Sequence, residues 1–479
     1  MNIEDEICRG QSRRAFLQKS STGLGALALA SLVNGTARAD DNLAVPGAMK
    51  ALNWAPKAKR VIHLFMSGAP SHLDLFDPKP KLIEMTGKDL PESVRQGQRI
   101  TTMTSGQKNL LCVGSPFKFE KYGKAQMTLS ELLPHTSKIV DDCLWIKTMF
   151  TEPINHDPAF TFFNTGHQQP GRPTMGAWAS YGLGGMNQNL PAYVVMNSGG
   201  GGQPLQSRYW GNGFLPAQHG GCLFRSDGDA VLYLSNPPGI TPEARRRMLD
   251  TSNDLNKLAL ADLGDPAISA QIENYELAFR MQTSVPELMD LSKEKKETLE
   301  LYGATPGKGS FANNCLLARR LAERGVRFIQ LNHRDWDHHG GLPGGIKGKC
   351  KETDQACAAL VTDLKQRGLL DDTIVIWGGE FGRTAYSQGD IKPDNFGRDH
   401  HPRCFTMWMA GGGVKAGHVH GETDDFGYNI VRDGVHVHDF HATLLHLLGV
   451  DHKKMIYRHE GRDYRLTDIA GNVLKELIA

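Results

Sequence analysis

The sequence lacks an excess of charge of either sign. Its 479 residues include 54 lysines and arginines against 52 aspartates and glutamates, a formal net charge of +2. The small positive excess lies in the N-terminal stretch 1–39, and the rest of the chain is neutral. A basic face for nucleic acid or for anionic lipid is therefore not expected.

The chain also lacks an apolar run long enough for a comfortable membrane span. A twin arginine, Arg13-Arg14, precedes a short uncharged stretch rich in Ala, Gly and Leu, and an Ala-x-Ala site ends at Ala39. This pattern is typical of a twin-arginine signal peptide. We predict that residues 1–39 are removed on export, and that the mature chain, 40–479, is periplasmic or extracellular and has no membrane span.

Cys-x-x-Cys pairs, internal repeats and low-complexity tracts are all absent. Seven cysteines remain once Cys8 leaves with the signal, an odd number at spacings that do not match a zinc ribbon. Disulfides are compatible with the exported location, but the spacing assigns none. The glycine run at 199–202 lacks the strand and helix of a phosphate loop, so we interpret it as a flexible loop.

Short apolar runs alternate with helical patterns along most of the chain. A long block with one polar face, residues 241–325, indicates a helical segment within the same domain. Strands that alternate with helices predict a mostly parallel sheet covered on both faces, an α/β fold. The strand-like runs are 60–66, 143–149, 192–196, 326–331, 373–377 and 405–410.

A carboxylate and an imidazole follow the run at 326–331. Asp335 and His339 lie four residues apart, so on a tight turn they point the same way and can hold one divalent ion. Asp337 and His338 are near alternatives. The competing interpretation, a solvated polar loop, has to explain an unusual density of acidic and histidine residues.

Two further groups follow strand-like runs. Glu380 lies between glycines after the run at 373–377, a position that suits a ligand or a general base. The alternative is a turn glutamate paired with Arg383. His72 and Asp74 follow the first strand on one side of an extended segment, where they can bind metal, orient ligands or contact substrate; a surface loop is an equal alternative.

Asp399, His400 and His401 precede the run at 405–410. Either imidazole can complete a site with Asp335 and His339, because two histidines and a carboxylate with room for water form a recognised catalytic zinc set. The sequence does not favour one histidine over the other. Asp399 and Arg383 are predicted to contact substrate or to orient a ligand.

A set of sequence motifs is spread over nearly the whole mature chain: His72–Pro80, Gly171–Pro173 with Gly176–Trp178, Asn189–Ala192, Gly378–Arg383 and Gly411–Gly417. These motifs resemble the DUF1501 family, a sulfatase-like branch of the alkaline phosphatase/sulfatase superfamily. The resemblance implies an alkaline-phosphatase-like three-layer sandwich with a helical insertion. It also implies hydrolysis of a sulfate or phosphate ester.

The chain departs from that superfamily at the nucleophile. Spacing from Thr165-Gly166 places His156 where relatives carry Ser, Thr or a cysteine converted to formylglycine. Formylglycine chemistry therefore has no residue to act on, and the resemblance makes His156 an extra ligand or an unusual nucleophile. Phe381 stands where a second metal would need a ligand. These departures leave one divalent metal site, for which zinc is the expected ion.

We therefore expect an exported metal-dependent hydrolase of sulfate or phosphate esters, whose substrate is a small molecule or a carbohydrate. Its catalytic residues would be His156 and Glu380. The alternative is a non-catalytic metal- or glycan-binding member of the superfamily that has lost its nucleophile. The sequence does not indicate an oligomeric state.

Overall fold

The computed structural model describes residues 47–226, 228–392 and 394–479. The predicted signal peptide lies outside this described part. Within it, no helix combines the length and the apolar character that a membrane crossing requires.

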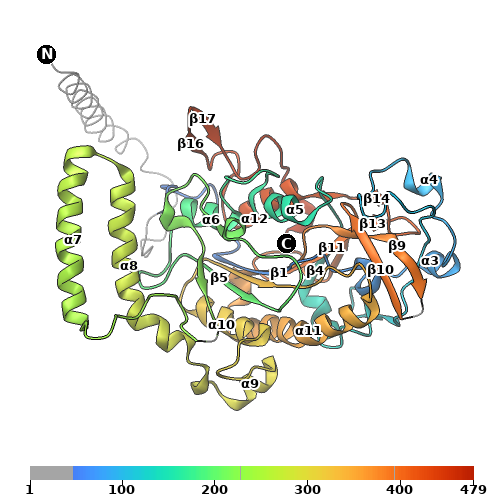
Figure 1. Ribbon diagram of the computed structural model, residues 1–479, viewed down its shortest axis with the longest axis horizontal. Helices are drawn as coiled ribbons and strands as arrows, with labels where there is room; N and C mark the ends of the chain where they lie inside the picture. Colours follow the sequence, from blue (N-terminus) through green and yellow to red (C-terminus); the bar gives the residue numbers. More distant parts are fainter. Residues whose placement is uncertain (1–46, 227, 393) are drawn as a thin grey trace.

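A nine-stranded sheet forms the centre of the described chain (Figure 1). The strand order is β12-β4-β11-β8-β1-β7-β5-β6, and β15 pairs with β4. Only β11 among these strands runs antiparallel to its neighbours, so the sheet is mostly parallel. The strands are β1 (Arg60–Met66), β4 (Cys143–Phe150), β5 (Tyr193–Ser198), β6 (Cys222–Phe224), β7 (Phe328–His333), β8 (Thr373–Gly378), β11 (Phe405–Ala410), β12 (His418–His420) and β15 (Val435–His436).

Helices cover both faces of this sheet because its strands are apolar on both faces. In β1, Ile62 and Leu64 face one core cluster, whereas Val61 and Phe65 face another. The first cluster includes α10 (Phe311–Glu323) and α11 (Leu342–Gln366), and the second includes α5 (His156–Thr165), α6 (Met175–Leu183) and α12 (Val437–Leu447). Figure 1 shows these two helical layers above and below the sheet. The predicted three-layer α/β architecture is confirmed.

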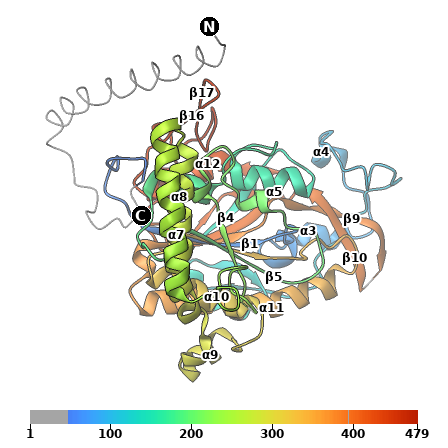
Figure 2. The same ribbon diagram turned by 60° about the vertical axis from the view of Figure 1, so that its left-hand side comes forward.

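The predicted helical segment contains α7 (Pro242–Leu263), α8 (Pro266–Met289) and α9 (Lys296–Tyr302), and ends with α10. The side chain of Thr241 caps α7 by accepting the Ala244 N–H, as expected where Thr-Pro begins a helix. α7 and α8 form an antiparallel hairpin at one end of the molecule (Figure 2).

A second, two-stranded sheet lies at the opposite end of the molecule in Figure 1 and was not predicted. It pairs β9 (Gly382–Lys392) with β10 (Asn395–His401), and its last residues reach the carboxyl edge of the central sheet. His400 and His401 therefore lie on a strand. The remaining short elements are α2 (His72–Leu75), α3 (Pro80–Glu84), α4 (Glu92–Arg95), β2 (Phe119–Tyr122), β3 (Met127–Ser130), β13 (Glu422–Thr423), β14 (Ile430–Arg432), β16 (Tyr457–His459), β17 (Arg462–Tyr464) and the 3-10 turns η1 (Thr136–Asp142), η2 (Ser207–Trp210), η3 (Ala217–His219), η4 (Leu291–Lys293), η5 (Leu370–Asp372) and η6 (Lys475–Leu477).

Candidate metal centre

Three imidazoles and one carboxylate meet at the carboxyl edge of the central sheet. They belong to His156, Asp337, His339 and His400, and one ligand atom from each lies within 4.8 Å of all the others. His156 begins α5 after β4, Asp337 and His339 follow β7, and His400 is near the end of β10. Ends of parallel strands gather at one edge, which explains why residues far apart in the chain meet there.

The imidazoles all turn the same ring nitrogen toward the Asp337 carboxylate. His339 Nε2 lies 2.9 Å and His400 Nε2 lies 3.4 Å from Asp337 Oδ1. His156 Nε2 lies 3.1 Å from Asp337 Oδ2, but the pair does not form an aligned hydrogen bond, and this buried nitrogen has no hydrogen-bond partner. The three nitrogens thus converge on one carboxylate.

The opposite ring nitrogens are each held by an acceptor. His156 Nδ1 donates to Glu380 Oε1 at 2.6 Å, His400 Nδ1 donates to the Ile154 carbonyl at 2.8 Å, and His339 Nδ1 contacts Gln388 Oε1. Metal-bound histidines have this arrangement, because a bond at one nitrogen fixes the ring orientation and leaves the other free to coordinate.

His400 shows most clearly that the cluster suits a cation. Its Nδ1 must carry hydrogen, because the Ile154 carbonyl can only accept. Burial lowers the pKa of His400 to about 4, so the ring is neutral at pH 7 and Nε2 presents a lone pair to Asp337. Two acceptors that face each other repel unless a cation lies between them. The cluster can therefore hold a metal ion.

The charges around Asp337 favour a positive group at the same place. Burial raises the pKa of Asp337, but the Arg383 guanidinium and the three imidazoles beside it outweigh burial and keep that pKa well below its ordinary value. Burial lowers the pKa of His156, yet the neighbouring carboxylates of Asp337 and Glu380 leave it above the ordinary value. A proton on His156, or a metal cation between its Nε2 and Asp337, places positive charge between the carboxylates of Asp337 and Glu380.

The loop after β1 packs against Glu380 at the base of the site. The Gly68 N–H donates to Glu380 Oε1 at 3.1 Å, and Glu380 is fully buried. Gly68 has φ +111°, and a Cβ there would lie 2.6 Å from the Asp337 backbone nitrogen. Only glycine fits this position, which brings the β1 loop close enough to hold the carboxylate that orients His156.

A family model matches residues 58–478, almost the entire described chain. The chain belongs to the DUF1501 family. The description of this family is "Protein of unknown function". No curated protein matches the chain.

Solved structures similar to this DUF1501 chain include sulfatases and alkaline phosphatases. A protein of the alkaline phosphatase superfamily from Vibrio parahaemolyticus is 11% identical over 87% of this chain and 72% of its own, with a TM-score of 0.35. A sulfatase from Pseudoalteromonas sp. is 12% identical over 82% and 68%, with a TM-score of 0.34. An alkaline phosphatase from the Antarctic bacterium TAB5 is 10% identical over 75% and 92%, with a TM-score of 0.28. Likeness at this level says nothing about the chemistry of the site.

Asp335, predicted as a ligand, lies outside the cluster of this DUF1501 protein. It has φ +76°, is 40% exposed in its side chain and has its carboxylate 3.4 Å from Lys349 Nζ. The left-handed backbone turns Asp335 away and leaves Asp337 to face the histidines. The sequence had identified Asp337 only as a near alternative.

The structure also separates the two neighbouring histidines on β10. His400 joins the cluster, whereas His401 Nε2 lies 2.7 Å from the Tyr428 carbonyl and its ring stacks on Tyr428. Successive side chains of a strand point to opposite faces, so the two cannot both face the cluster. Asp399 is buried between Thr101 and Thr104, whose hydroxyls donate to it, and it accepts the backbone N–H of His400.

His72 and Asp74 are buried but lie outside the cluster. His72 Nε2 bonds to the Gly427 carbonyl at 3.0 Å, and Asp74 forms a fully buried ion pair with Arg398 at 2.7 Å. These contacts tie α2 to the turn at Gly427 and to β10.

Arg383 has a direct role in the cluster. Its Nη2 lies 2.6 Å from Asp337 Oδ1, and its other nitrogens donate to backbone carbonyls, including Ala69 O at 2.9 Å. Each of the three guanidinium nitrogens of Arg383 is thus hydrogen-bonded within the protein, and Arg383 holds Asp337 in place. Gln388, which holds His339, had no sequence pattern to mark it.

Proposed function

We propose that this protein is an exported metal-dependent hydrolase of sulfate or phosphate esters, including esters on carbohydrates. One divalent ion would be held by His156, Asp337, His339 and His400. The observation that carries the proposal is the set of three histidines whose Nδ1 atoms are tied to protein acceptors and whose Nε2 atoms converge on one carboxylate.

The donor set favours zinc. Imidazole and carboxylate ligands suit zinc, and the hydrogen bonds at Nδ1 supply the outer contacts that zinc-bound histidines make. A divalent ion held here supplies Lewis acidity toward an ester oxygen and activates water at neutral pH.

The protein's own residues then have distinct tasks. His156 Nδ1 is hydrogen-bonded to Glu380 and Nε2 faces Asp337 within the cluster. This arrangement favours the ligand alternative over an attacking nucleophile. Water is therefore the proposed nucleophile. Glu380 is fully buried against Gly68 and His156, so it orients the ligand and does not act as a base in contact with substrate. His339 is the most exposed member, at 25% of its side chain, and marks the side that substrate approaches.

Charge favours an anionic ester. Two carboxylates, Asp337 and Glu380, and one guanidinium, Arg383, leave the protein groups with one net negative charge. A divalent cation reverses this to one net positive charge. A desolvated positive site attracts sulfate or phosphate esters over neutral ones.

One observation favours the non-catalytic alternative. Four protein ligands complete a tetrahedral zinc set, as in structural sites, whereas catalytic zinc usually has three protein ligands and an open position. A protein of this kind would bind metal tightly without turnover.

Asp337→Asn and Asp335→Asn form a matched pair that tests the proposal. We expect Asp337→Asn to lose most of its bound metal and its hydrolysis of p-nitrophenyl sulfate or phosphate, and Asp335→Asn to retain both. Metal content is measured by elemental analysis of the purified proteins, and hydrolysis by release of p-nitrophenol. Metal-free wild type contradicts the metal site. Fully loaded wild type without activity toward either ester class supports the non-catalytic alternative.

A further inference from the structure

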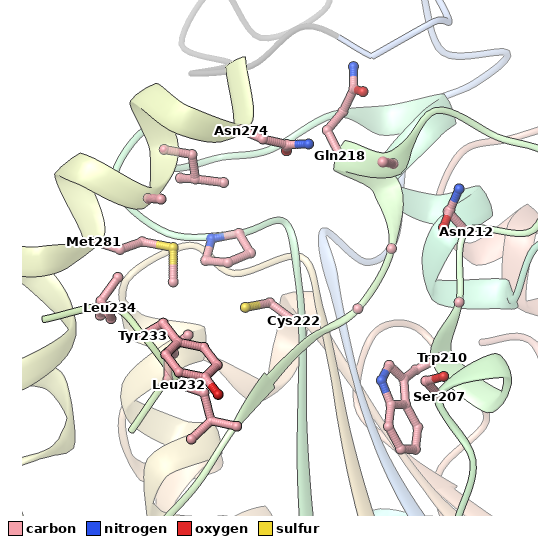
Figure 3. A pocket seen from close by; sticks show the side chains of 18 of the residues that line it. Ser207, Trp210, Asn212, Gln218, Cys222, Leu232, Tyr233, Leu234, Asn274 and Met281 are labelled. Atoms are coloured by element: carbon pink, nitrogen blue, oxygen red, sulfur yellow. The ribbon is translucent and has the colours of Figure 1, made fainter. Parts of the chain in front are cut away.

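A cavity of about 590 Å³ lies between α8 and the segment from Ser207 to Leu234 (Figure 3). It is separate from the metal cluster, none of whose four residues lines it. Its volume is in the range of pockets that bind small molecules, about 300–1,000 Å³. Neither the sequence motifs nor the proposed reaction assigns it a role.

One wall of the cavity is joined to the start of α5. Arg208, which lines it, forms an ion pair with Asp157, the residue after His156. The Tyr209 hydroxyl donates to the same carboxylate at 2.6 Å. Arg208 and Tyr209 thus fix the cavity wall to the start of α5, where the cluster begins.

The chain just before this segment packs against the loop that follows β7. A Cβ on Gly202 would lie 2.8 Å from Asp335 Cα, and Arg334 Nε donates to the Gln203 carbonyl at 3.3 Å. The glycine run therefore packs against the loop that also carries Asp337.

The lining is almost uncharged, and it combines aliphatic side chains such as Leu234, Leu277 and Met281 with amides and aromatic rings. Amide side chains come from Asn212, Gln218 and Asn274, and aromatic rings from Trp210 and Tyr233. Figure 3 shows the Tyr233 ring at the front of the cavity and the amides of Gln218 and Asn274 at the top. The one charged residue in the lining, Arg208, is already paired.

One feature sets the rim of the cavity apart. Tyr233 has φ +60° and 94% of its surface exposed, and Leu232 beside it is 54% exposed. A strained backbone that holds two large side chains out at a cavity rim is expected where a ligand covers them.

We propose that this cavity binds an uncharged sugar residue of an oligosaccharide ester, with the charged ester group at the metal cluster. This inference rests on the proposed function and adds the binding site for the part of the substrate that does not react. Sugar rings present C–H faces that pack on aromatic rings, and hydroxyls that pair with amides. A lining without free charge disfavours a second anionic or cationic group in the cavity.

Binding of unreactive sugars tests the site apart from catalysis. The probes are hexasaccharides of galactose, fucose, glucose or mannose that carry neither sulfate nor phosphate, followed by saturation-transfer NMR and calorimetry on the full mature protein. We expect at least one to bind the wild type. Tyr233→Ala and Asn274→Ala should each weaken it by about tenfold, the loss expected for one aromatic or hydrogen-bonding contact.

Tyr275→Ala is the matched control, because Tyr275 is an exposed tyrosine on α8 that does not line the cavity. It should bind like the wild type. No binding by any of the four hexasaccharides overturns the proposal. The proposal is also overturned if Tyr233→Ala and Asn274→Ala bind the sugar as well as the wild type does. A sugar contact that NMR maps to another surface overturns it as well.

Kinetics separate this proposal from the proposed function. Tyr233→Ala should raise KM for a sulfated or phosphorylated oligosaccharide without changing kcat/KM for a p-nitrophenyl ester. Sugar binding without hydrolysis of any ester defeats the hydrolase proposal but supports the cavity. Hydrolysis of both substrate types with KM unaffected in Tyr233→Ala defeats the cavity but supports the hydrolase.

Discussion

Replacing each of two adjacent histidines gives the sharpest test of the metal centre. His400 and His401 are neighbours on β10, and both are buried, at 4% and 1% exposed. His400 turns Nε2 toward Asp337, whereas His401 bonds to the Tyr428 carbonyl. His400→Ala and His401→Ala therefore remove the same group from the same strand, but only His400→Ala is expected to weaken metal binding.

The size of the effect follows from the ligand count. A full set of zinc ligands is worth about 10–16 kcal/mol, so one of four contributes about 3 kcal/mol, roughly a hundredfold in Kd. Losing His401 removes a hydrogen bond and a stacked ring, which lowers the free energy of unfolding by about 1–3 kcal/mol without touching the ion. The two variants should thus differ in metal affinity more than in stability.

Competition with a chromophoric zinc chelator measures Kd, and thermal unfolding with and without zinc measures the linkage. At a free zinc concentration a hundred times the wild-type Kd, binding stabilises the wild type and His401→Ala by about 2.7 kcal/mol. The same concentration should stabilise His400→Ala by only about 0.4 kcal/mol. Tight zinc binding by His400→Ala, or its loss in His401→Ala alone, would refute the assigned ligand set.

Two further predictions concern export and acid stability. Replacing both Arg13 and Arg14 with lysine should leave the precursor in the cytoplasm, as fractionation and immunoblotting would detect, and normal export of that variant contradicts the twin-arginine prediction. Burial raises the pKa of Asp74, but the buried Arg398 outweighs burial and keeps that pKa below its ordinary value. The ionised carboxylate therefore stabilises the fold fully above its unfolded pKa of about 3.9, and this contribution is lost as the pH falls through the folded pKa. Asp74→Asn should cost about 3–5 kcal/mol at pH 7 in denaturant unfolding, and the gap from wild type should narrow in acid; a pH-independent gap contradicts the ionised pair.

The strands of the central sheet could be predicted because burial on both faces leaves a simple pattern. The runs at 60–66 and 405–410 match β1 and β11 residue for residue. Each is a short, mainly apolar run bounded by turn residues, which is typical of a strand buried on both faces.

The β9–β10 hairpin could not be predicted in the same way. Its sequence is mainly polar, with glycine and charged residues, and the pairing is irregular near His400. Without a strand at 395–401, His400 and His401 are equivalent in sequence. The alternation that separates them exists only once β10 is paired with β9.

The choice between Asp335 and Asp337 depended on local backbone conformation. Four-residue spacing suggested that Asp335 and His339 share a face, which holds on a helical turn. The chain from 334 to 338 is not helical, and the positive φ of Asp335 reverses its side-chain direction. Such a conformation is uncommon for a residue other than glycine, so spacing alone does not indicate it.

The distribution of the four cluster residues over the chain would make metal binding a late event in folding. The start of α5, the loop after β7 and the end of β10 must all be in place before His156, Asp337, His339 and His400 face one another. No short fragment contains the complete set. An ion bound there would slow unfolding by joining the hairpin to the central sheet, and its uptake would report that the most distant contacts of the chain have formed.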